Sequence, residues 1–580
     1  MPQTTAKTRL GIARPTATPR LDVALDPSRE QVPPSQNSST PDDRSMTSDH
    51  PLPPPRRPNL LGLKRRPART DSWLSELGSV WKLALPVAAS ELAWATMNLV
   101  DLLVLGRVGV KAIAAASLGS TLHFMTIIVG MGLLAGMDPM VSQAHGAGER
   151  RDARQTLFHG GWLAIAMTAP MMLIVWAVSH LLEPWGIEPE LAEATRSYLL
   201  GLNFSTLPLM LYVAWRRYLQ GVGIVRSVMV VMIAANVINA ALDVWLVFGG
   251  LGLPALGVAG AGWATFGSRV FMSIGLLVCI RLYHRETGPI DSALAGRPTA
   301  WMEGLVWGVL EWSRVARLFR LGLPTAGQFL LEMGAFGTAT LMAGTLGEMP
   351  LAAHQLAMNL SSLTFMVPLG IGAAGAVRVG HNLGAGRPGQ ARRAGWTAMT
   401  LGVVFMFGAA VAFLLLPRTL MSAYTSDPNL IELAAALLFL AALFQLFDGV
   451  QVIATGLMRG AGETQIPMFV NGVAHWMIGL PLGWWLAFRQ GLNVTGLWIG
   501  LTLGLVVTGT ALLVFWTHLA GRLETVKLAI DPPSTEPADT KRPVESTPKP
   551  NDAPTTFPPS QHPSEDSRAP AALPSGPVRV

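Results

Sequence analysis

The chain has 580 residues, of which 50% are hydrophobic and 14% are charged, whereas soluble chains carry roughly 25% charged residues. Residues 1–70 and 531–580 each contain 13 prolines and a large share of the charges. Between them about one residue in nine is charged, which excludes a set of ordinary soluble domains and indicates a polytopic membrane protein. The single cysteine, Cys279, excludes a disulfide framework and Cys-based zinc motifs.

Both ends of the chain are too poor in large apolar residues to bury a core. We therefore expect a disordered cytoplasmic Pro/Arg-rich tail over 1–70 and a disordered cytoplasmic Pro-rich tail over 531–580, and we expect transport to survive deletion of either. The net charge of +7 is typical of a membrane protein that keeps Lys and Arg on its cytoplasmic side, so nucleic acid is not an expected partner.

Twelve apolar stretches are long enough to cross a bilayer as helices. With both termini inside, the predicted cytoplasmic loops carry sixteen Lys and Arg residues and the opposite loops carry five, as the positive-inside rule requires. The predicted spans are approximately 80–105, 111–141, 156–180, 195–215, 228–249, 255–280, 320–344, 349–379, 395–416, 432–457, 465–487 and 493–518.

An internal repeat at an offset of 238 residues divides these spans into two sets of six. Pro86 falls on Pro324, and the run 146–148 (GAG) falls on 384–386 (GAG). The sequence thus predicts an all-α integral membrane fold of two six-helix lobes in the same orientation. The expected first lobe is 75–282, followed by a cytoplasmic linker over 283–319 with an interfacial amphipathic helix at 301–319, and the expected second lobe is 320–520.

Acidic side chains inside four spans are the strongest functional signal, because a carboxylate in hydrocarbon needs a partner, a proton or a water-filled cavity. They are Asp101 in span 1, Asp243 in span 5, Glu332 in span 7 and Asp448 in span 10. Spans 1 and 5 run in the same direction, so Asp101 and Asp243 lie at similar depth and can share one site. We expect Glu332 and Asp448 to bind a cation or proton near the middle of the bilayer.

Asn239 lies four residues before Asp243, so the two side chains share a helical face and can offer oxygens to one Na⁺ or one proton. The alternative is that Asn239 bonds a neighbouring helix and Asp243 pairs with Arg216, Arg217 or Arg269. For Glu332 and Asp448 the alternative is a buried hydrogen bond to backbone or to Arg459. Glu91 is a secondary candidate on another face of span 1. His354, His381 and His475 are interpreted as hydrogen-bonded groups within the bundle.

Enzyme motifs are missing from the sequence. No Lys follows a Gly anywhere in the chain, so the Gly-Lys pair of a phosphate-binding loop cannot occur. We therefore expect a protein that is not an enzyme and that has no cofactor apart from a coupling ion.

Several motifs resemble those of the multidrug and toxic compound extrusion (MATE) family, particularly its NorM-like bacterial branch, over roughly residues 75–520. Pro86 precedes Asp101 by fifteen residues, and the other matching motifs are VSQAHGAG (141–148), YLQGVG (218–223), NAALD (239–243), LAAHQLAMN (351–359), VRVGHNLGAG (377–386) and DGVQVIATGLMRGAG (448–462).

The resemblance implies two lobes around a central cavity and export of organic cations in exchange for Na⁺ or H⁺. By this resemblance Asp101, Asn239 and Asp243 match the first-lobe cation and proton site, with Thr265 as a possible neighbour. Glu332 and Asp448 match the second-lobe acids. Phe444 stands where relatives carry Tyr, which weakens the case for a second-lobe Na⁺ site and favours protonation there.

The function expected from sequence is therefore secondary active multidrug efflux by alternating access, from a bacterial inner membrane with both termini cytoplasmic. Its expected partners are small organic cations and the lipid bilayer, and the expected state is a monomer. Two alternatives remain open. A flippase for lipid-linked precursors or polysaccharide would need Arg along its cavity, and a non-transporting scaffold would not explain the buried acids.

Overall fold

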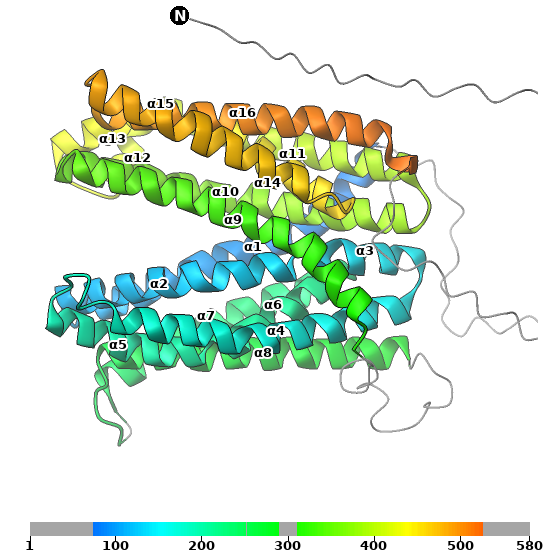
Figure 1. The fold of residues 1–580 in the computed structure, drawn as a ribbon, viewed down its shortest axis with the longest axis horizontal. Helices are drawn as coiled ribbons and strands as arrows, with labels where there is room; N and C mark the ends of the chain where they lie inside the picture. The colour runs from blue at the N-terminus through cyan, green and yellow to red at the C-terminus, as the bar shows by residue number, and fades with distance from the viewer. Residues whose placement is uncertain (1–72, 251, 289–309, 526–580) are drawn as a thin grey trace, which may run out of the picture. The chain divides into compact units, whose positions relative to one another are not determined.

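The computed structural model describes residues 73–250, 252–288 and 310–525, so the predicted tails and most of the predicted linker lie outside the described residues. Within these ranges the chain is helical, apart from turns and an isolated β-bridge between Gly250 and Leu253. The helices, labelled in Figure 1, are α1 (Trp73–Leu105), α2 (Val110–Leu134), α3 (Met137–Ala147), α4 (Arg150–His180), α5 (Pro189–Phe204), α6 (Thr206–Gly221), α7 (Val225–Phe248), α8 (Val258–Thr287), α9 (Trp312–Thr345), α10 (Glu348–Gly384), α11 (Pro388–Leu415), α12 (Pro417–Ser422), α13 (Pro428–Gly460), α14 (Gln465–Gly472), η3 (Val473–Gly479), α15 (Leu480–Trp484), η4 (Trp485–Arg489), α16 (Asn493–Gly521) and η5 (Leu523–Thr525).

The membrane spans predicted from sequence correspond to helices of the structure. In the described residues, nine helices are long and apolar enough to cross a bilayer, or ten if the bent pair α5 and α6 counts as one span. The other two predicted spans are α9, whose sequence includes polar residues among the apolar ones, and the run from α14 to η4, which changes between α- and π-helical geometry. The predicted all-α fold of twelve spans is confirmed.

Span 7 begins earlier than the sequence predicts. The expected interfacial helix over 301–319 and the expected span over 320–344 are joined, because α9 runs without a break from Trp312 to Thr345. Arg314 in its first turn pairs with Asp152 on α4 and with Glu311 just before the helix. These ion pairs compensate the buried guanidinium, so the helix can enter the bundle directly. Residues 301–309 lie outside the described residues.

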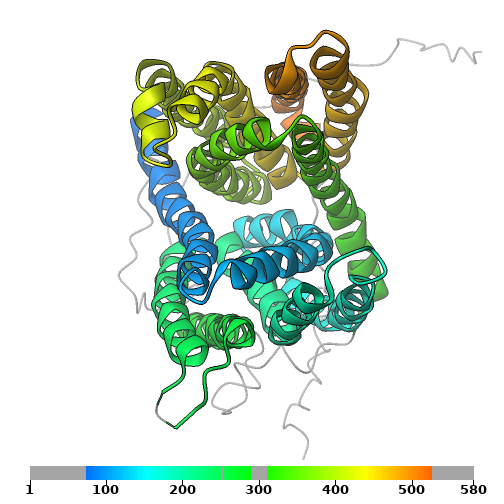
Figure 2. The same cartoon turned by 90° about the vertical axis from the view of Figure 1, so that its left-hand side faces the viewer.

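Two groups of helices lie side by side in Figure 2, one formed by α1–α8 and the other by α9–α16. Each group has its own apolar core. The first turns of α1 pack into the core of the second group, and the first turns of α9 pack into the core of the first group. Val80 and Ala84 of α1 are buried in a core formed mainly by α10, α11, α13 and α16. Leu318 and Leu321 of α9 are buried in the core of the first group. Each group thus completes its core with the start of a helix from the other.

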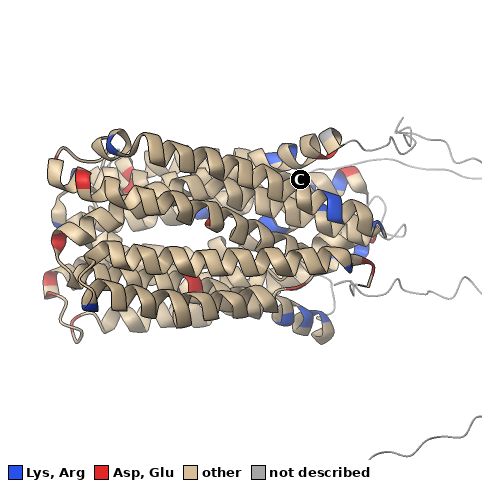
Figure 3. Ribbon diagram, turned by 90° about the horizontal axis from the view of Figure 1, so that it is seen from above, with Lys and Arg blue, Asp and Glu red and all other residues tan. Residues whose placement is uncertain are grey.

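The two groups also touch closely where α3 meets the end of α10. Gly146 lies against the backbone of His381, and Gly384 lies against the backbone of Gln143, so a Cβ at either glycine would overlap main-chain atoms. Lys and Arg residues gather toward one end of the bundle, and few charged residues lie along its middle (Figure 3). This distribution is typical of a protein surrounded by lipid at its middle.

Candidate functional site

A cavity of about 320 Å³ lies between the two groups of helices. Its walls come from α1, α2 and α6 of the first group and from α9, α10 and α13 of the second. Most of the wall is apolar, with aromatic and Met side chains that include Phe124, Met131, Phe329, Met333, Phe336, Met358 and Phe365. The charged side chains on the wall are Glu91, Arg216, Arg217, Glu332, Asp448 and Arg459. A cavity of this kind suits a flat or flexible apolar molecule that carries charge.

Glu332 on α9 is held in the cavity wall by side-chain amides. Gln451 Nε2 on α13 donates a 2.9 Å hydrogen bond to one carboxylate oxygen, and Asn471 Nδ2 on α14 donates a 3.3 Å bond to the other. Gln328, one helical turn earlier on α9, also interacts with the carboxyl group. Neither backbone nor Arg459 holds Glu332, so the alternative considered from sequence is not what the structure shows. The amides instead fix the carboxyl group where it faces the cavity.

Asp448 lies in the same wall as Glu332, three residues before Gln451 on α13. The two acids are close enough for their charges to interact. Arg459, the partner considered for Asp448 from sequence, pairs elsewhere. The structure therefore places both predicted second-lobe acids in one cavity.

Phe444 is buried one turn before Asp448. Its ring packs against Phe336 and Trp498, with ring centroids 6.0 and 5.5 Å apart respectively. The position contributes apolar surface to the cavity and no oxygen ligand. That Phe444 weakens a second-lobe Na⁺ site stays a prediction.

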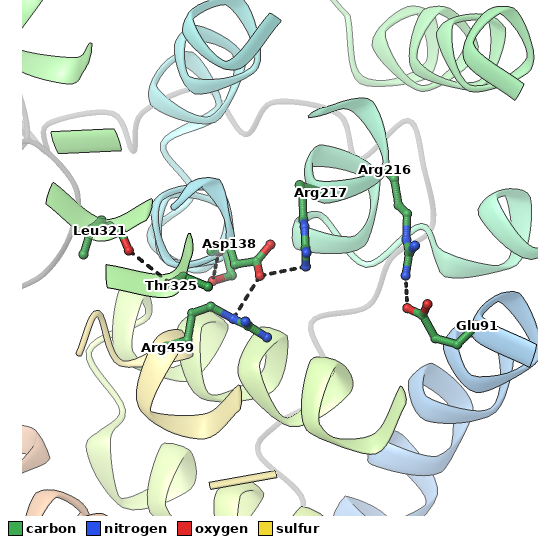
Figure 4. Close-up of polar contacts among 8 residues, drawn as sticks. Glu91, Asp138, Arg216, Arg217, Leu321, Thr325 and Arg459 are labelled. Carbon is green, nitrogen blue, oxygen red and sulfur yellow. Dashed lines mark hydrogen bonds and ion pairs between the residues drawn. The ribbon is translucent and has the colours of Figure 1, made fainter. Parts of the chain in front are cut away.

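Glu91, the secondary candidate on α1, forms an ion pair with Arg216 of α6 at the cavity wall. Nearby, Asp138 of α3 accepts from Arg217 of α6 at 3.1 Å and lies 3.2 Å from Nε of Arg459 on α13, as Figure 4 shows. Because α3 and α6 belong to one group and α13 to the other, the Asp138 carboxylate joins the two groups at this end of the cavity. Two of the three arginines considered as partners for Asp243, Arg216 and Arg217, are thus paired here instead.

Two hydrogen bonds join the two groups of helices at the same end of the cavity, and their side chains occupy equivalent positions in the repeat. Gln143 Nε2 of α3 donates to the Gly460 carbonyl of α13 at 3.0 Å, and His381 Nε2 of α10 bonds the Gly221 carbonyl of α6 at 2.7 Å. The 238-residue offset places His381 at the position equivalent to Gln143. We call this region, defined by Asp138, Gln143, His381 and Arg459, the clasped end.

The predicted first-lobe residues come together away from the cavity. Asp101 of α1 interacts with Asn239 and Asp243 of α7, and Asp101 Oδ2 accepts a 3.3 Å bond from Thr265 of α8. All four are buried. Within the described residues, no hydrogen-bond partner is present for Asp101 Oδ1, for either oxygen of Asp243 or for either amide atom of Asn239. The prediction that Asn239 and Asp243 share a face with Asp101 opposite them is consistent with this arrangement.

The donor set of this first-lobe cluster fits a monovalent cation or a proton. It offers two carboxylates, an amide oxygen and a hydroxyl, and hard cations prefer oxygen ligands. No group of three or more His, Cys, Asp or Glu side chains that could hold a metal ion occurs among the described residues. Two carboxylates so close together repel when both are ionised, so one bound cation relieves their repulsion.

Sequence reasoning gave several of these residues no role. Asp138, Gln451 and Asn471 show no distinctive spacing in the sequence. Only the fold brings Gln451 into the cavity wall, Asn471 to Glu332 and Asp138 to Arg459. Arg269 was considered only as a partner for Asp243. Arg269 lies on α8 and is buried beside Asp101 of α1. Burying its charge costs free energy, as it does for the four acids, so the same reasoning from sequence applies to this arginine.

These features define a helical membrane transporter, with a cavity between two repeated lobes and a separate buried acid cluster within the first lobe. A protein-family model described as MatE matches residues 86–245 and 324–485, two segments that correspond to the two halves of the repeat. The chain therefore belongs to the MatE family of multidrug and toxic compound extrusion transporters, and its relatives place it in the NorM-like branch.

The curated relatives align over nearly their full length. A probable multidrug resistance protein NorM from Mesorhizobium japonicum is 36% identical over 451 residues, which are 77% of this chain and 94% of the relative. The corresponding protein of Deinococcus radiodurans is 37% identical over 455 residues, 77% of this chain and 96% of the relative. The multidrug resistance protein NorM of Burkholderia vietnamiensis is 34% identical over 461 residues, 78% and 96%.

Solved structures share the fold at lower identity. The eukaryotic MATE transporter AtDTX14 superposes with a TM-score of 0.66 at 22% identity, over 78% of this chain and 99% of that chain. An outward-facing multidrug resistance MATE transporter superposes with a TM-score of 0.69 at 18% identity, over 78% and 97%. Both confirm the two-lobed architecture.

Replacing Asp138 by Asn should destabilise the clasped end. The change leaves the buried Arg459 and the half-buried Arg217 close to each other without the carboxylate between them, and breaking a fully buried ion pair costs about 3 kcal/mol or more. We expect a lower Tm of the purified protein by several degrees. Glu183→Gln is the matched control, because its partner Arg196 is partly exposed and such pairs contribute about 0–1 kcal/mol. Equal Tm values for both variants would show that Asp138 does not hold the lobes together.

Proposed function

We propose that this protein exports organic cations in exchange for inward movement of Na⁺ or H⁺, by alternating access of its two lobes. The observation that carries the proposal is the buried cluster of Asp101, Asn239 and Asp243, most of whose polar side-chain atoms have no hydrogen-bond partner among the described residues. A separate cavity between the lobes carries two further acids. The NorM names of the relatives support multidrug export as the activity.

The cavity supports a cationic substrate. Glu332 and Asp448 offer negative charge, while Phe329, Phe336 and Phe365 offer rings against which a planar cation can stack. A carboxylate that is neutralised by a coupling ion cannot also neutralise the substrate. Each ligand therefore displaces the other, and that competition links the two fluxes.

The location proposed for the protein is the inner membrane of a bacterium, with both termini and the clasped end on the cytoplasmic side. Lys and Arg gather at one end of the bundle, and the positive-inside rule assigns that end to the cytoplasm. We further propose that the protein acts as a monomer in the bilayer, with no cofactor besides the coupling ion.

A lipid-linked precursor flippase remains a second candidate because Arg216, Arg217 and Arg459 line the cavity. Each of these guanidinium groups is, however, paired with Glu91 or Asp138. The acids that are left without an arginine partner are Glu332 and Asp448. This balance favours a cation over a pyrophosphate-bearing lipid.

The test uses the full chain in proteoliposomes loaded with a fluorescent cationic dye. A pH gradient and a Na⁺ gradient are imposed separately, with protein-free liposomes as the control. One inward gradient should drive dye out, and collapse of that gradient by an ionophore should stop the efflux. Efflux that depends on neither gradient, or movement of a pyrophosphate lipid but not of the dye, would contradict the proposal.

A further inference from the structure

Arg269 is a buried cation next to the first-lobe cluster. It lies on α8 one helical turn after Thr265, and only 8% of its surface is exposed. Its charge interacts with that of Asp101. Tyr198 of α5 and His123 of α2 also lie close enough to interact with it. The guanidinium therefore compensates part of the negative charge of the cluster.

The same guanidinium reaches the break in span 4. Arg269 Nη1 donates a 2.6 Å hydrogen bond to Ser205 Oγ. Ser205 is the residue between α5 and α6, and the two helices meet there at an angle of 43°. A hydrogen bond to a residue at a helix break holds the bend at that point. One side chain thus contacts both the acid cluster and the break.

The two helices that meet at Ser205 differ in what they contact. α5 is fixed to α8, because Gly201 lies against the backbone of Gly262 so closely that a Cβ would overlap it. α6 carries Arg216 and Arg217, which face the cavity, and it ends at Gly221, whose carbonyl bonds His381. α6 also packs on α8, where Tyr218 hydrogen-bonds His284, so a change in the bend changes the angle of α6 relative to both α5 and α8. Such a movement alters the cavity wall and the clasped end together.

The charge of the cluster determines how strongly Arg269 is held. With Asp101 and Asp243 ionised, the guanidinium is held by the charge of Asp101, and the cluster together with the guanidinium carries one net negative charge. A bound monovalent cation removes that charge and weakens the attraction. The position of the guanidinium, and with it the bond to Ser205, then depends on whether the cluster has bound its ion.

We infer that Arg269 is a positioning residue that transmits ion binding at the Asp101–Asp243 cluster to the break at Ser205, and so to α6. The inference rests on the proposed function, because it requires that the cluster bind a coupling ion. It assigns to span 4 the role of the element that responds to the ion. A purely structural role would require only that Arg269 neutralise Asp101.

Hydrogen exchange of the full-length protein in lipid nanodiscs separates these roles. Exchange of the backbone amides in 206–221 is compared with and without the ion, using NaCl against choline chloride and, separately, a downward step in pH. Ion binding is followed independently as the ion-induced rise in Tm. The variants are Ser205→Ala, which removes the hydroxyl that accepts from Arg269 and donates to the Leu202 carbonyl, and Arg269→Gln. Arg285→Gln, an exposed arginine on the same helix, is the matched control.

The parent and Arg285→Gln should show an ion-induced change in exchange over 206–221. Ser205→Ala should lose that change while keeping the ion-induced rise in Tm, and Arg269→Gln should lose it as well. The inference is overturned if Ser205→Ala keeps the response of α6, or if the parent binds its ion without a response there. If no ion raises the Tm of the parent, the proposed cation site is overturned and this inference with it, so the two failures are distinguishable.

Discussion

Replacing Asp243 by Asn should abolish ion-driven export of a cationic dye while leaving the protein folded. Both carboxylate oxygens of Asp243 are buried without a hydrogen-bond partner in the described part of the chain, so the charge contributes nothing visible to packing. Removing an uncompensated buried charge is neutral or stabilising. We therefore expect efflux at the level of protein-free vesicles and a Tm equal to or above that of the parent.

Asp101→Asn should also abolish export but should lower stability. Asp101 accepts a bond from Thr265 and offsets the charge of Arg269, so its loss leaves a buried guanidinium uncompensated. The double variant should export no worse than either single variant, as expected for two residues that serve one step. Glu348→Gln, an exposed acid at the start of α10, is the control at matched protein levels. Multiplicative losses, or normal efflux in Asp243→Asn, would contradict a shared site.

Glu332→Gln and Asp448→Asn should each impair export through the cavity. Both acids face the space where a cationic substrate would lie, and loss of either charge should raise the KM for the dye. Glu332→Gln should cost more stability than Asp448→Asn, because the amides of Gln451 and Asn471 then face a side chain with only one acceptor oxygen.

The measurement is dye efflux as a function of dye concentration, together with the Tm of each variant. Gln445, which is buried one turn before Asp448 on α13 and bonds Thr364, offers a control: Gln445→Leu removes a polar group on the same helix as Asp448 without touching the charge of the cavity. Export by Glu332→Gln and Asp448→Asn that matches the parent at equal expression would remove the second-lobe acids from the mechanism.

The spans and the acid cluster were predictable because they depend on local pattern. Apolar length and loop charge identify the helices, and the four-residue spacing of Asn239 and Asp243 places both on one helical face.

The contacts of Asp138 were not predictable, because Arg459 is more than 300 residues away and on another lobe. Neither were the amides that hold Glu332, since Gln and Asn inside a span are common and acquire a role only when packing brings them to a carboxylate. The start of α9 was misjudged because its arginines suggested a membrane surface, whereas Arg314 is neutralised within the protein.

The exchanged first turns of α1 and α9 have a consequence for the origin of the fold. Val80 and Leu318 are equivalent positions in the repeat, and each is fully buried in the core of the opposite lobe. Two identical half-length chains that exchanged the first turns of their first helices in this way would form a closed, two-fold symmetric swapped dimer. The present chain retains that arrangement within one polypeptide. In a half-molecule expressed alone, the first turns of its first helix would have no core to pack into, and its own core would lack the turns that the other half supplies. Neither lobe is therefore an independent folding unit.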